Sequence, residues 1–304
     1  MTLVELKYVL ALAQEGHFGR AASRCHVSQP TLSVAIDKLE KSLNVCIFER
    51  QTKGFRITEV GERLIEQAQA VIEAADKFSD IAEGSRHQLD TPLKLGGIYT
   101  VAPYLFPSLI PELKKQAPKM PLIINEDYTK NLRVKLQLGE LDAIFVALPF
   151  DEPSVVVKPL YEEPFVVLMP KNHVLSKQAA INASDLAGEN MLILGEGHCF
   201  RDQVLKACPQ CYTPNEFQQI IEGSSLETLR HMVASGLGIT VLPATATSVT
   251  HYSKTLITRP FKTSKPKRTI ALAWRASFPR AKAIDALIQS LQCARISNVC
   301  PINS

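Results

Sequence analysis

Residues 18–33 read FGRAASRCHVSQPTLS, and this stretch decides the fold of the amino-terminal part of the chain. A short helix is followed by a tight connection at 25–27. Ser28 is then a favourable N-cap for a second helix that runs to about Leu43. Pro30 fits the start of that helix, because the first turn needs no N–H group from it. Two short helices joined by a tight turn predict a helix-turn-helix.

In a helix-turn-helix, the amino end of the second helix enters the major groove of DNA. Gln29 is the candidate for reading a base edge, and Thr31 or Ser33 for contacting a phosphate or a thymine methyl group. Two short strands at 45–50 and 55–58, around a glycine-containing turn, predict a basic wing that meets the DNA backbone or minor groove. Those charges could instead be ordinary solvated ones. The predicted DNA-contacting residues are Arg20, Ser28, Gln29, Pro30, Thr31, Ser33, Arg50, Lys53, Arg56 and Thr58.

A long helix is expected over residues 59–83, followed by a polar hinge at 84–91. Apolar residues recur along it at helical spacing, from Leu64 to Ile81. No later segment of similar length offers a partner for this stripe, so we expect it to pair with the same helix of a second chain. The DNA-binding domain is assigned to residues 1–58, and a dimer would present two of them to two half-sites.

The head, meaning residues 1–58, resembles the LysR-type transcriptional regulator family. The residues that carry this resemblance are 18–22, 27–33, Ile36, 39–40, Leu43, Phe48, Arg50 and 58–61. The resemblance implies a winged helix-turn-helix, a linker helix that forms a dimer, and an effector domain built like a periplasmic binding protein. Such proteins are commonly tetramers. It also implies double-stranded promoter DNA and RNA polymerase as partners.

The bulk composition restricts the classes of protein to which the chain can belong. Its 304 residues are 46% hydrophobic, which favours packed domains over disorder. The formal net charge is only +4, so DNA binding must come from a local basic surface. No apolar run predicts a membrane span, and the first residues lack the pattern of a signal peptide. We therefore expect a cytoplasmic protein with reduced thiols, whose seven cysteines are not a disulfide scaffold. Cys25 and Cys46 are expected to pack in the core of the head.

Beyond the hinge, short β-rich runs alternate with helical segments, which predicts an α/β domain with a largely parallel sheet. Strands are expected at 93–98, 121–126, 141–147, 164–169, 191–194, 239–242 and 270–274, and helices at 105–116, 131–138, 226–234 and 282–294. In the architecture that the family resemblance implies, residues 92–304 form the regulatory domain. Its subdomain I would cover about 92–162 and 268–304, with subdomain II inserted at about 163–267.

Cys199 and Cys208 are the residues of the regulatory region that most suggest chemistry. Cys199 follows a glycine-containing turn and precedes a segment expected to be helical, so it lies near a helix amino terminus, where the dipole favours a thiolate. Arg201 and His198 are expected to add positive charge. Peroxide oxidises a thiolate to a sulfenic acid, which a second thiol can trap as a disulfide. Joined to a DNA-reading head, the pair predicts a redox-controlled regulator, unless Cys199 is a buried, inert cysteine.

The spacing of these two cysteines predicts a conformational change. If residues 199–208 are helical, a rise of about 1.5 Å per residue separates the two α-carbons by up to about 13 Å. A disulfide requires roughly 4.4–6.8 Å between α-carbons. The segment must therefore unwind before the bond can form, and oxidation would remodel the surface around residues 199–220.

Cys208 and Cys211 also form a Cys-x-x-Cys pair, which is typical of a thioredoxin-like motif or of half of a zinc site completed by His198 and Cys199. Neither is favoured, because the pair follows an expected helix rather than opening one, and isolated spacing is a weak signal. We therefore expect no metal and no cofactor. Cys211 could nevertheless replace Cys208 as the partner of Cys199.

The regulatory region resembles the peroxide-sensing members of the LysR-type family in residues 197–203, Cys208, 225–230 and 236–243. This resemblance implies that Cys199 is the peroxidatic cysteine and Cys208 the resolving one. It also implies a thiol reductant such as glutaredoxin or thioredoxin as a partner. The implied hydrogen peroxide pocket is built from Thr100, Thr129, His198, Asp202 and Arg268.

Two other functions stay open from the residues themselves. A LysR-type regulator could respond to a small metabolite bound between the two regulatory subdomains. A thiol peroxidase would use the same cysteines, although the complete DNA-binding head argues against it. The favoured hypothesis, a peroxide-sensing regulator, is not an enzyme, because its cysteine chemistry is stoichiometric and needs an external reductant.

Overall fold

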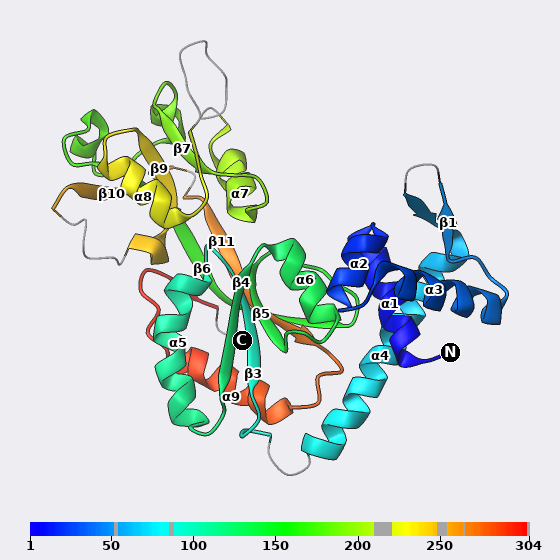
Figure 1. Ribbon diagram of the computed structural model, residues 1–304. Helices are drawn as coiled ribbons and strands as arrows, with labels where there is room; N and C mark the ends of the chain where they lie inside the picture. The colour runs from blue at the N-terminus through cyan, green and yellow to red at the C-terminus, as the bar shows by residue number, and fades with distance from the viewer. Residues whose placement is uncertain (52–53, 85–87, 210–220, 248–253, 264, 303–304) are drawn as a thin grey trace. The chain divides into compact units, whose positions relative to one another are not determined.

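The computed structural model describes residues 1–51, 54–84, 88–209, 221–247, 254–263 and 265–302 (Figure 1). These residues form two compact units, the first made mainly of residues 1–87 and the second of 88–136, 141–276 and 281–304. Three predicted features lie outside the described residues: Lys53, Cys211 and positions 85–87 of the predicted hinge. The side chain of Arg50 lies outside them as well.

The head folds as the helix-turn-helix and wing that its sequence predicts. Its elements are α1 (Leu3–Glu15), α2 (Phe18–Arg24), α3 (Gln29–Leu43), β1 (Phe48–Arg50), β2 (Phe55–Ile57) and α4 (Glu59–Gly84). Gly16 ends α1 in the left-handed conformation that glycine favours, with φ +61°. Ser28 caps α3, because its Oγ accepts a hydrogen bond from the backbone N–H of Thr31 at 3.3 Å. The wing is the antiparallel pair β1–β2.

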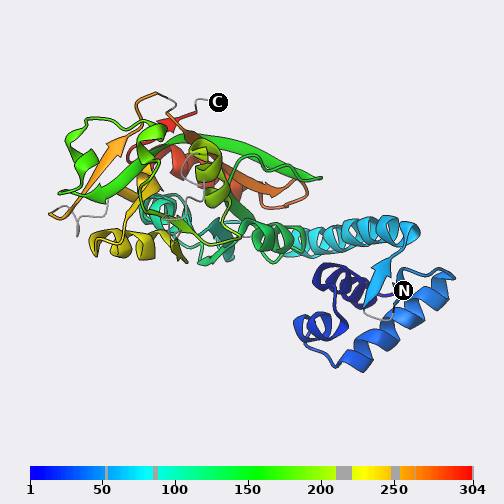
Figure 2. The same ribbon diagram turned by 90° about the horizontal axis from the view of Figure 1, so that it is seen from above.

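Helix α4 is one continuous helix of 26 residues, drawn in cyan in Figure 2. Part of its apolar stripe packs inside its own chain: Ala68 and Ile72 are buried in the core that also contains Val9 of α1. Val71 and Phe78 remain 40% and 78% exposed. The short helix α1, which comes earlier in the chain, therefore covers one part of the stripe. Only the exposed part is left for a second chain.

The regulatory unit is built on strands in the order β4-β3-β5-β11-β6-β9-β7-β8, with β10 and β12 also paired to β6. The strands are β3 (Leu93–Ile98), β4 (Leu122–Asp127), β5 (Ala143–Ala147), β6 (Val155–Pro170), β7 (Met191–Leu194), β8 (Ile221–Gly223), β9 (Ile239–Pro243), β10 (Leu256–Pro260), β11 (Lys267–Arg275) and β12 (Cys300–Pro301). The helices are α5 (Ala102–Gln116), α6 (Thr129–Gln137), α7 (Cys199–Ala207), α8 (Leu226–Ala234) and α9 (Ala281–Cys293), with 3-10 turns η1 (Val174–Lys177), η2 (Ala183–Leu186) and η4 (Ala244–Thr247).

The sheet is mixed, which corrects the prediction of a largely parallel one. β3 pairs in parallel with β4 and β5, and β7 with β8 and β9. The long strands β6 and β11 run antiparallel to each other, because the chain passes from one group of strands to the other along β6 and returns along β11. The first part of β6 pairs with β11, and its last residues pair with β9 and β10.

Helices cover both groups of strands and give each a core. Figure 1 shows α7 and α8 beside β7 and β9, and α5 beside β3. The core under α7 contains Phe200, Val204 and Cys208, packed with residues such as Leu192 and Leu194 of β7. Helix α7 is therefore held in place by apolar contacts along the face that ends at Cys208.

Candidate functional site

Helix α7 carries one candidate cysteine at each end. Cys199 is its first residue, directly after the N-cap His198, and Cys208 is its C-cap. Both residues are cysteines outside any disulfide, with Cys199 half-buried and Cys208 fully buried. The predicted helical segment between them is confirmed, so its length holds the two α-carbons about 13 Å apart. That separation is about twice what a disulfide tolerates.

A small cavity lies beside Cys199, where the ends of β3 and β4 meet the turn before α7. Its lining residues are Ile98, Tyr99, Thr100, Asp127, Tyr128, Thr129, Gly197, His198 and Cys199. The structure thus brings Thr100, Thr129 and His198 together with Cys199. The cavity measures about 10 Å³, which is room for about one water-sized molecule.

The two threonine hydroxyls of the cavity differ in their hydrogen-bond partners. Thr129 Oγ1 is buried and has no hydrogen-bond partner within the part of the chain that the structure describes. Thr100 Oγ1 accepts a hydrogen bond from Nη1 of Arg268 at 2.8 Å. Because the Thr100 oxygen accepts this bond, its own hydrogen stays available to donate. The cavity therefore offers two hydroxyl groups to a small polar molecule.

Arg268 supports the cavity from behind rather than lining it. It is 3% exposed, and its Nη2 donates to the backbone carbonyl of Thr100 at 2.8 Å. Its Nε donates to Oε2 of the buried Glu163 at 2.7 Å. Its guanidinium lies over the ring of Phe200, 4.9 Å from the ring centre. Arg268 thus connects the cavity wall at Thr100 with the first turn of α7.

The surroundings of His198 disfavour its charged form, which is contrary to the expectation that it adds positive charge. Burial lowers the pKa of His198, although a hydrogen bond to Ser224 acts in the opposite direction. Its Nε2 lies 3.2 Å from the Ser224 carbonyl oxygen, which can only accept, so Nε2 carries the hydrogen and Nδ1 is the acceptor. Tyr99 and Tyr128 contact the imidazole edge-on, at 5.9 and 4.8 Å between ring centres.

Arg201 and Asp202, the other charged residues close to Cys199 in the sequence, also have surroundings that differ from those predicted. Nη1 of Arg201 donates to the Leu194 carbonyl at 2.7 Å and to Glu222 at 2.6 Å, so its charge is already paired. Asp202 is exposed and does not line the cavity. Asp202 comes three residues after Cys199 on α7, and a place on the same side of the helix does not by itself bring a side chain to the cavity.

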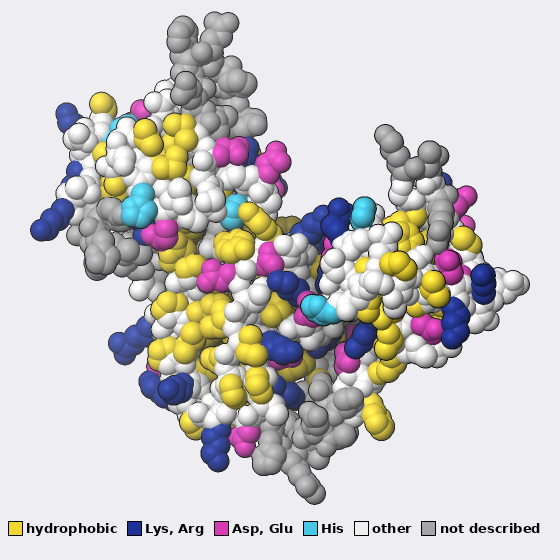
Figure 3. Space-filling model, viewed as in Figure 1, with side chains coloured by type: hydrophobic (Ala, Val, Ile, Leu, Met, Phe, Trp, Pro, Cys, Tyr) yellow, Lys and Arg dark blue, Asp and Glu magenta, His cyan; other side chains and the backbone are white. Residues whose placement is uncertain are grey.

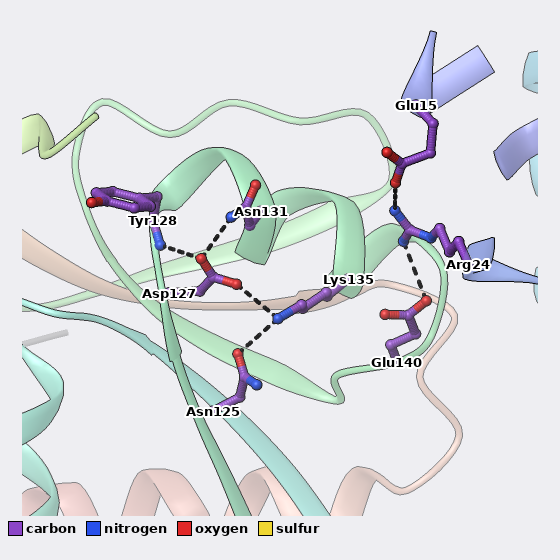
Figure 4. A network of polar contacts seen from close by, with 8 residues as sticks. All are labelled: Glu15, Arg24, Asn125, Asp127, Tyr128, Asn131, Lys135 and Glu140. Carbon is purple, nitrogen blue, oxygen red and sulfur yellow. Dashed lines mark hydrogen bonds and ion pairs between the residues drawn. The ribbon is translucent and has the colours of Figure 1, made fainter. Parts of the chain in front are cut away.

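Asp127 is a site residue that the sequence prediction missed. Figure 4 shows its carboxylate accepting hydrogen bonds from the backbone N–H of Tyr128, from Asn131 and from Lys135, at 2.6 to 2.8 Å. Lys135 also donates to Asn125 at 3.0 Å. Burial alone would raise the pKa of Asp127, but these bonds together lower it. Asp127 therefore fixes the start of α6, where Thr129 lies; its position between a strand and a helix was the available signal.

The remaining cysteines and acidic groups that the structure describes define no second centre. Among the described residues, no group of three or more His, Cys, Asp or Glu side chains could hold a metal ion. Cys25 is half-buried, but Cys46 is exposed, so the prediction of a core position for Cys46 is wrong. It lies in the connection between α3 and β1, where the chain runs over the surface.

The candidate DNA-contacting residues that the structure describes lie on α2, in the first turns of α3, on β2 and directly before α4. Arg20, Ser28, Gln29, Pro30, Thr31 and Arg56 are exposed, whereas Ser33 and Thr58 are half-buried. The hydroxyl of Thr58 donates to the Cys46 carbonyl at 2.6 Å and accepts from the Gly61 N–H at 2.9 Å, so it serves as the cap of α4. Basic and acidic side chains are interspersed on the face in Figure 3, as the small net charge suggests.

In the described part of the chain, no helix has both the length and the apolar character needed to cross a membrane.

Comparisons with known proteins agree with this geometry. The family model of bacterial regulatory helix-turn-helix proteins of the lysR family matches residues 3–62, and the LysR substrate binding domain matches residues 86–295. The DNA-binding transcriptional dual regulator OxyR of Escherichia coli (strain K12) is 36% identical, over 96% of this chain and 95% of that protein.

Solved structures are similar over the full length as well. A full-length OxyR variant from Pseudomonas aeruginosa is 52% identical with a TM-score of 0.75, over 100% of this chain and 98% of that one. A hydrogen-peroxide-bound OxyR mutant from Corynebacterium glutamicum is 32% identical with a TM-score of 0.63, over 96% of this chain and 92% of that one. The chain therefore belongs to the LysR family of bacterial helix-turn-helix regulators, in the group that includes the OxyR proteins.

Proposed function

We propose that the protein is a DNA-binding transcription regulator that senses hydrogen peroxide through oxidation of Cys199 and disulfide formation with Cys208. The observation that carries this proposal is the buried Thr129 hydroxyl in the cavity beside Cys199, which has no hydrogen-bond partner among the residues that the structure describes. An unpaired buried hydroxyl costs about 1–3 kcal/mol. Hydrogen peroxide both donates and accepts hydrogen bonds, so it can satisfy Thr129. A metabolite of ordinary size does not fit a cavity of about 10 Å³.

The first chemical step transfers one peroxide oxygen to sulfur. The Cys199 sulfur attacks the near oxygen, the O–O bond breaks, and an S–O bond forms, giving the Cys199 sulfenic acid. The leaving oxygen takes the thiol proton and departs as water. Hydrogen bonds from Thr100 and Thr129 stabilise charge that develops on the leaving oxygen, and Arg268 strengthens the Thr100 contribution by holding its oxygen.

The second step joins the two cysteines. The Cys208 sulfur attacks the sulfenic sulfur, an S–S bond forms, and the hydroxyl leaves with the Cys208 proton as a second water. In total, two thiols and one peroxide become one disulfide and two waters. The reaction requires α7 to unwind, and Cys208 to leave the core that it shares with Phe200 and Val204. Oxidation therefore changes the packing and surface of this side of the regulatory domain.

The head binds DNA, so a change in the regulatory domain can alter transcription through it. We place residues 1–58, 59–83 and 84–91 as the DNA-binding domain, the dimerising helix and the hinge, with the regulatory domain at 92–304. A dimer or tetramer binds promoter DNA and acts with RNA polymerase in the cytoplasm. A thiol reductant such as glutaredoxin or thioredoxin returns the protein to its reduced form. The cysteine chemistry is stoichiometric, so the protein is a regulator like its relatives and not an enzyme.

Peptide mass spectrometry after a short, near-stoichiometric peroxide pulse tests this function. The reduced full-length protein is oxidised for seconds, its free thiols are alkylated, and the disulfide-linked peptides are identified. We expect a Cys199–Cys208 linkage, no linkage in Cys199→Ser, and a trapped sulfenic acid in Cys208→Ser. A linkage from Cys199 to Cys211 would identify a different resolving thiol. If all seven cysteines stay alkylatable, the redox function is wrong.

A further inference from the structure

The cavity beside Cys199 is supported by a buried carboxylate that does not touch it. Glu163 lies on β6 directly opposite Arg268 on β11 in the antiparallel register. The two side chains form an ion pair at 2.7 Å and are 0% and 1% exposed. A buried ion pair is not in general a gain in stability over apolar packing. Its clearer effect is to fix the geometry of the groups that it holds.

Both oxygens of the Glu163 carboxylate are occupied by donors from different parts of the fold. Oε2 accepts from Nε of Arg268. Oε1 accepts from the backbone N–H of Thr245 at 3.1 Å and from the Thr245 hydroxyl. Thr245 belongs to the 3-10 turn η4. Only a carboxylate can accept on both sides, because glutamine would turn an NH₂ donor toward either Arg268 or Thr245.

The guanidinium of Arg268 is planar, so a bond that holds its Nε also fixes the directions of Nη1 and Nη2. With Nε held by Glu163, Nη1 and Nη2 both reach Thr100, at its hydroxyl and its carbonyl. The face of the same guanidinium lies against Phe200, the residue after Cys199. By orienting the Arg268 guanidinium, Glu163 thus also fixes the contacts of Arg268 with Thr100 in the cavity wall and with Phe200 in the first turn of α7.

We propose that Glu163 is a positioning residue for the peroxide reaction: its carboxylate holds Arg268 so that the Thr100 hydroxyl stays in place beside Cys199. This inference rests on the proposed peroxide function and adds a residue to it. Glu163 acts only through Arg268 and Thr100, so it should affect the reaction with peroxide and not the accessibility or intrinsic reactivity of the Cys199 thiol.

The neighbouring Glu162 provides a matched control. It is on the same strand and forms an ion pair with Lys267 of β11 at 2.6 Å, but both side chains are partly exposed, at 35% and 56%. Glu163→Gln and Glu162→Gln therefore remove the same charge from adjacent positions of one strand. In the full-length protein, we would measure the rate of Cys199 oxidation by hydrogen peroxide and, separately, the rate of Cys199 alkylation by iodoacetamide.

We expect Glu163→Gln to slow peroxide oxidation by about 10- to 100-fold, as when a transition-state donor is lost or misplaced. Alkylation should stay within about twofold, and Glu162→Gln should match the wild type in both reactions. Unchanged peroxide oxidation in Glu163→Gln would overturn the proposal. An equal loss in both reactions would also overturn it, because it would indicate general disruption of the fold.

A double-variant cycle tests the route of action. Thr100→Val alone should slow peroxide oxidation, and adding Glu163→Gln should slow it little further, because both changes remove one interaction. Fully additive losses would refute a path through Thr100. If Glu163→Gln does not fold, Thr245→Val removes only one of the three donors and should give a smaller, few-fold loss in the peroxide reaction alone. Slow oxidation of wild-type Cys199 would instead refute the proposed function itself.

Discussion

At the scale of single residues, Thr129 is a side chain whose hydroxyl is buried in the cavity beside Cys199. Among the described residues this hydroxyl has no hydrogen-bond partner, and such a group favours the binding of a small polar molecule beside Cys199. We predict that Thr129→Val, which keeps the shape, leaves the free energy of unfolding unchanged or raises it by about 1 kcal/mol.

The same variant should slow peroxide oxidation of Cys199 by about 10- to 100-fold. Chemical denaturation and stopped-flow oxidation measure the two effects. Thr129→Ser, which keeps the hydroxyl, is the control and should oxidise at nearly the wild-type rate. Wild-type oxidation kinetics in Thr129→Val would show that this hydroxyl does not bind peroxide.

His198 gives a prediction about pH. Burial lowers the pKa of His198 in the folded state below its ordinary value of 6.5. Between the two pKa values the unfolded chain binds more protons, so the folded state loses stability as pH falls below about 6.5. The contribution of one such group is at most about 1.4 kcal/mol per pH unit.

We therefore expect the free energy of unfolding of the wild type to fall more steeply between pH 7 and pH 5 than that of His198→Gln. Urea unfolding at a series of pH values measures this difference. Parallel curves for the two proteins would contradict a buried, neutral His198.

At the scale of elements, we expect α3 to recognise bases and the wing to bind the DNA backbone. Gln29 is exposed at the first position of α3, and Arg56 is exposed on β2. We predict that Gln29→Ala reduces discrimination between operator and unrelated DNA by about 1–3 kcal/mol and leaves non-specific affinity unchanged.

Arg56→Ala should instead weaken binding to all sequences and lower the slope of log affinity against log salt by about 1. Fluorescence anisotropy titrations at several salt concentrations separate the two effects. Identical losses from the two variants, on specific and unrelated DNA alike, would rule out this division of roles.

Helix α7 shows why an element can be both stable and a switch. Its apolar face is buried with Phe200 and Val204, which holds the reduced arrangement together. The same helix keeps Cys199 and Cys208 too far apart to react. Forming the disulfide therefore removes the packing that stabilises the helix, so the two arrangements exclude each other.

At the scale of the whole molecule, the exposed side of α4 is the surface that we expect a second chain to cover. Phe78 is 78% exposed and Val71, two helical turns earlier on the same side, is 40% exposed, so α4 presents apolar surface that a second chain can cover. We predict that Phe78→Glu shifts the protein toward monomers at micromolar concentration and weakens operator binding, because two half-sites are no longer read together.

Analytical ultracentrifugation measures this assembly. Val174→Glu, at an equally exposed apolar position in η1, is the matched control and should assemble like the wild type. An unchanged oligomer in Phe78→Glu would exclude this side of α4 as a principal interface.

The sequence by itself determined the head, α7 and the pair of cysteines. The signals there are local: the Ser28 cap, the Gly16 stop and the spacing of apolar residues act within a few positions of the chain, where helix geometry fixes the outcome. Helix geometry is local as well, and it alone keeps Cys199 and Cys208 too far apart for a disulfide.

Only the tertiary structure decided the direction of β6 and β11, the burial of His198 and the support of Thr100 by Arg268 and Glu163. Arg268 is 105 positions from Glu163 and 168 from Thr100 along the chain. Such contacts depend on strand order and register. These are set by how the whole sheet assembles, and no local pattern of residues encodes them.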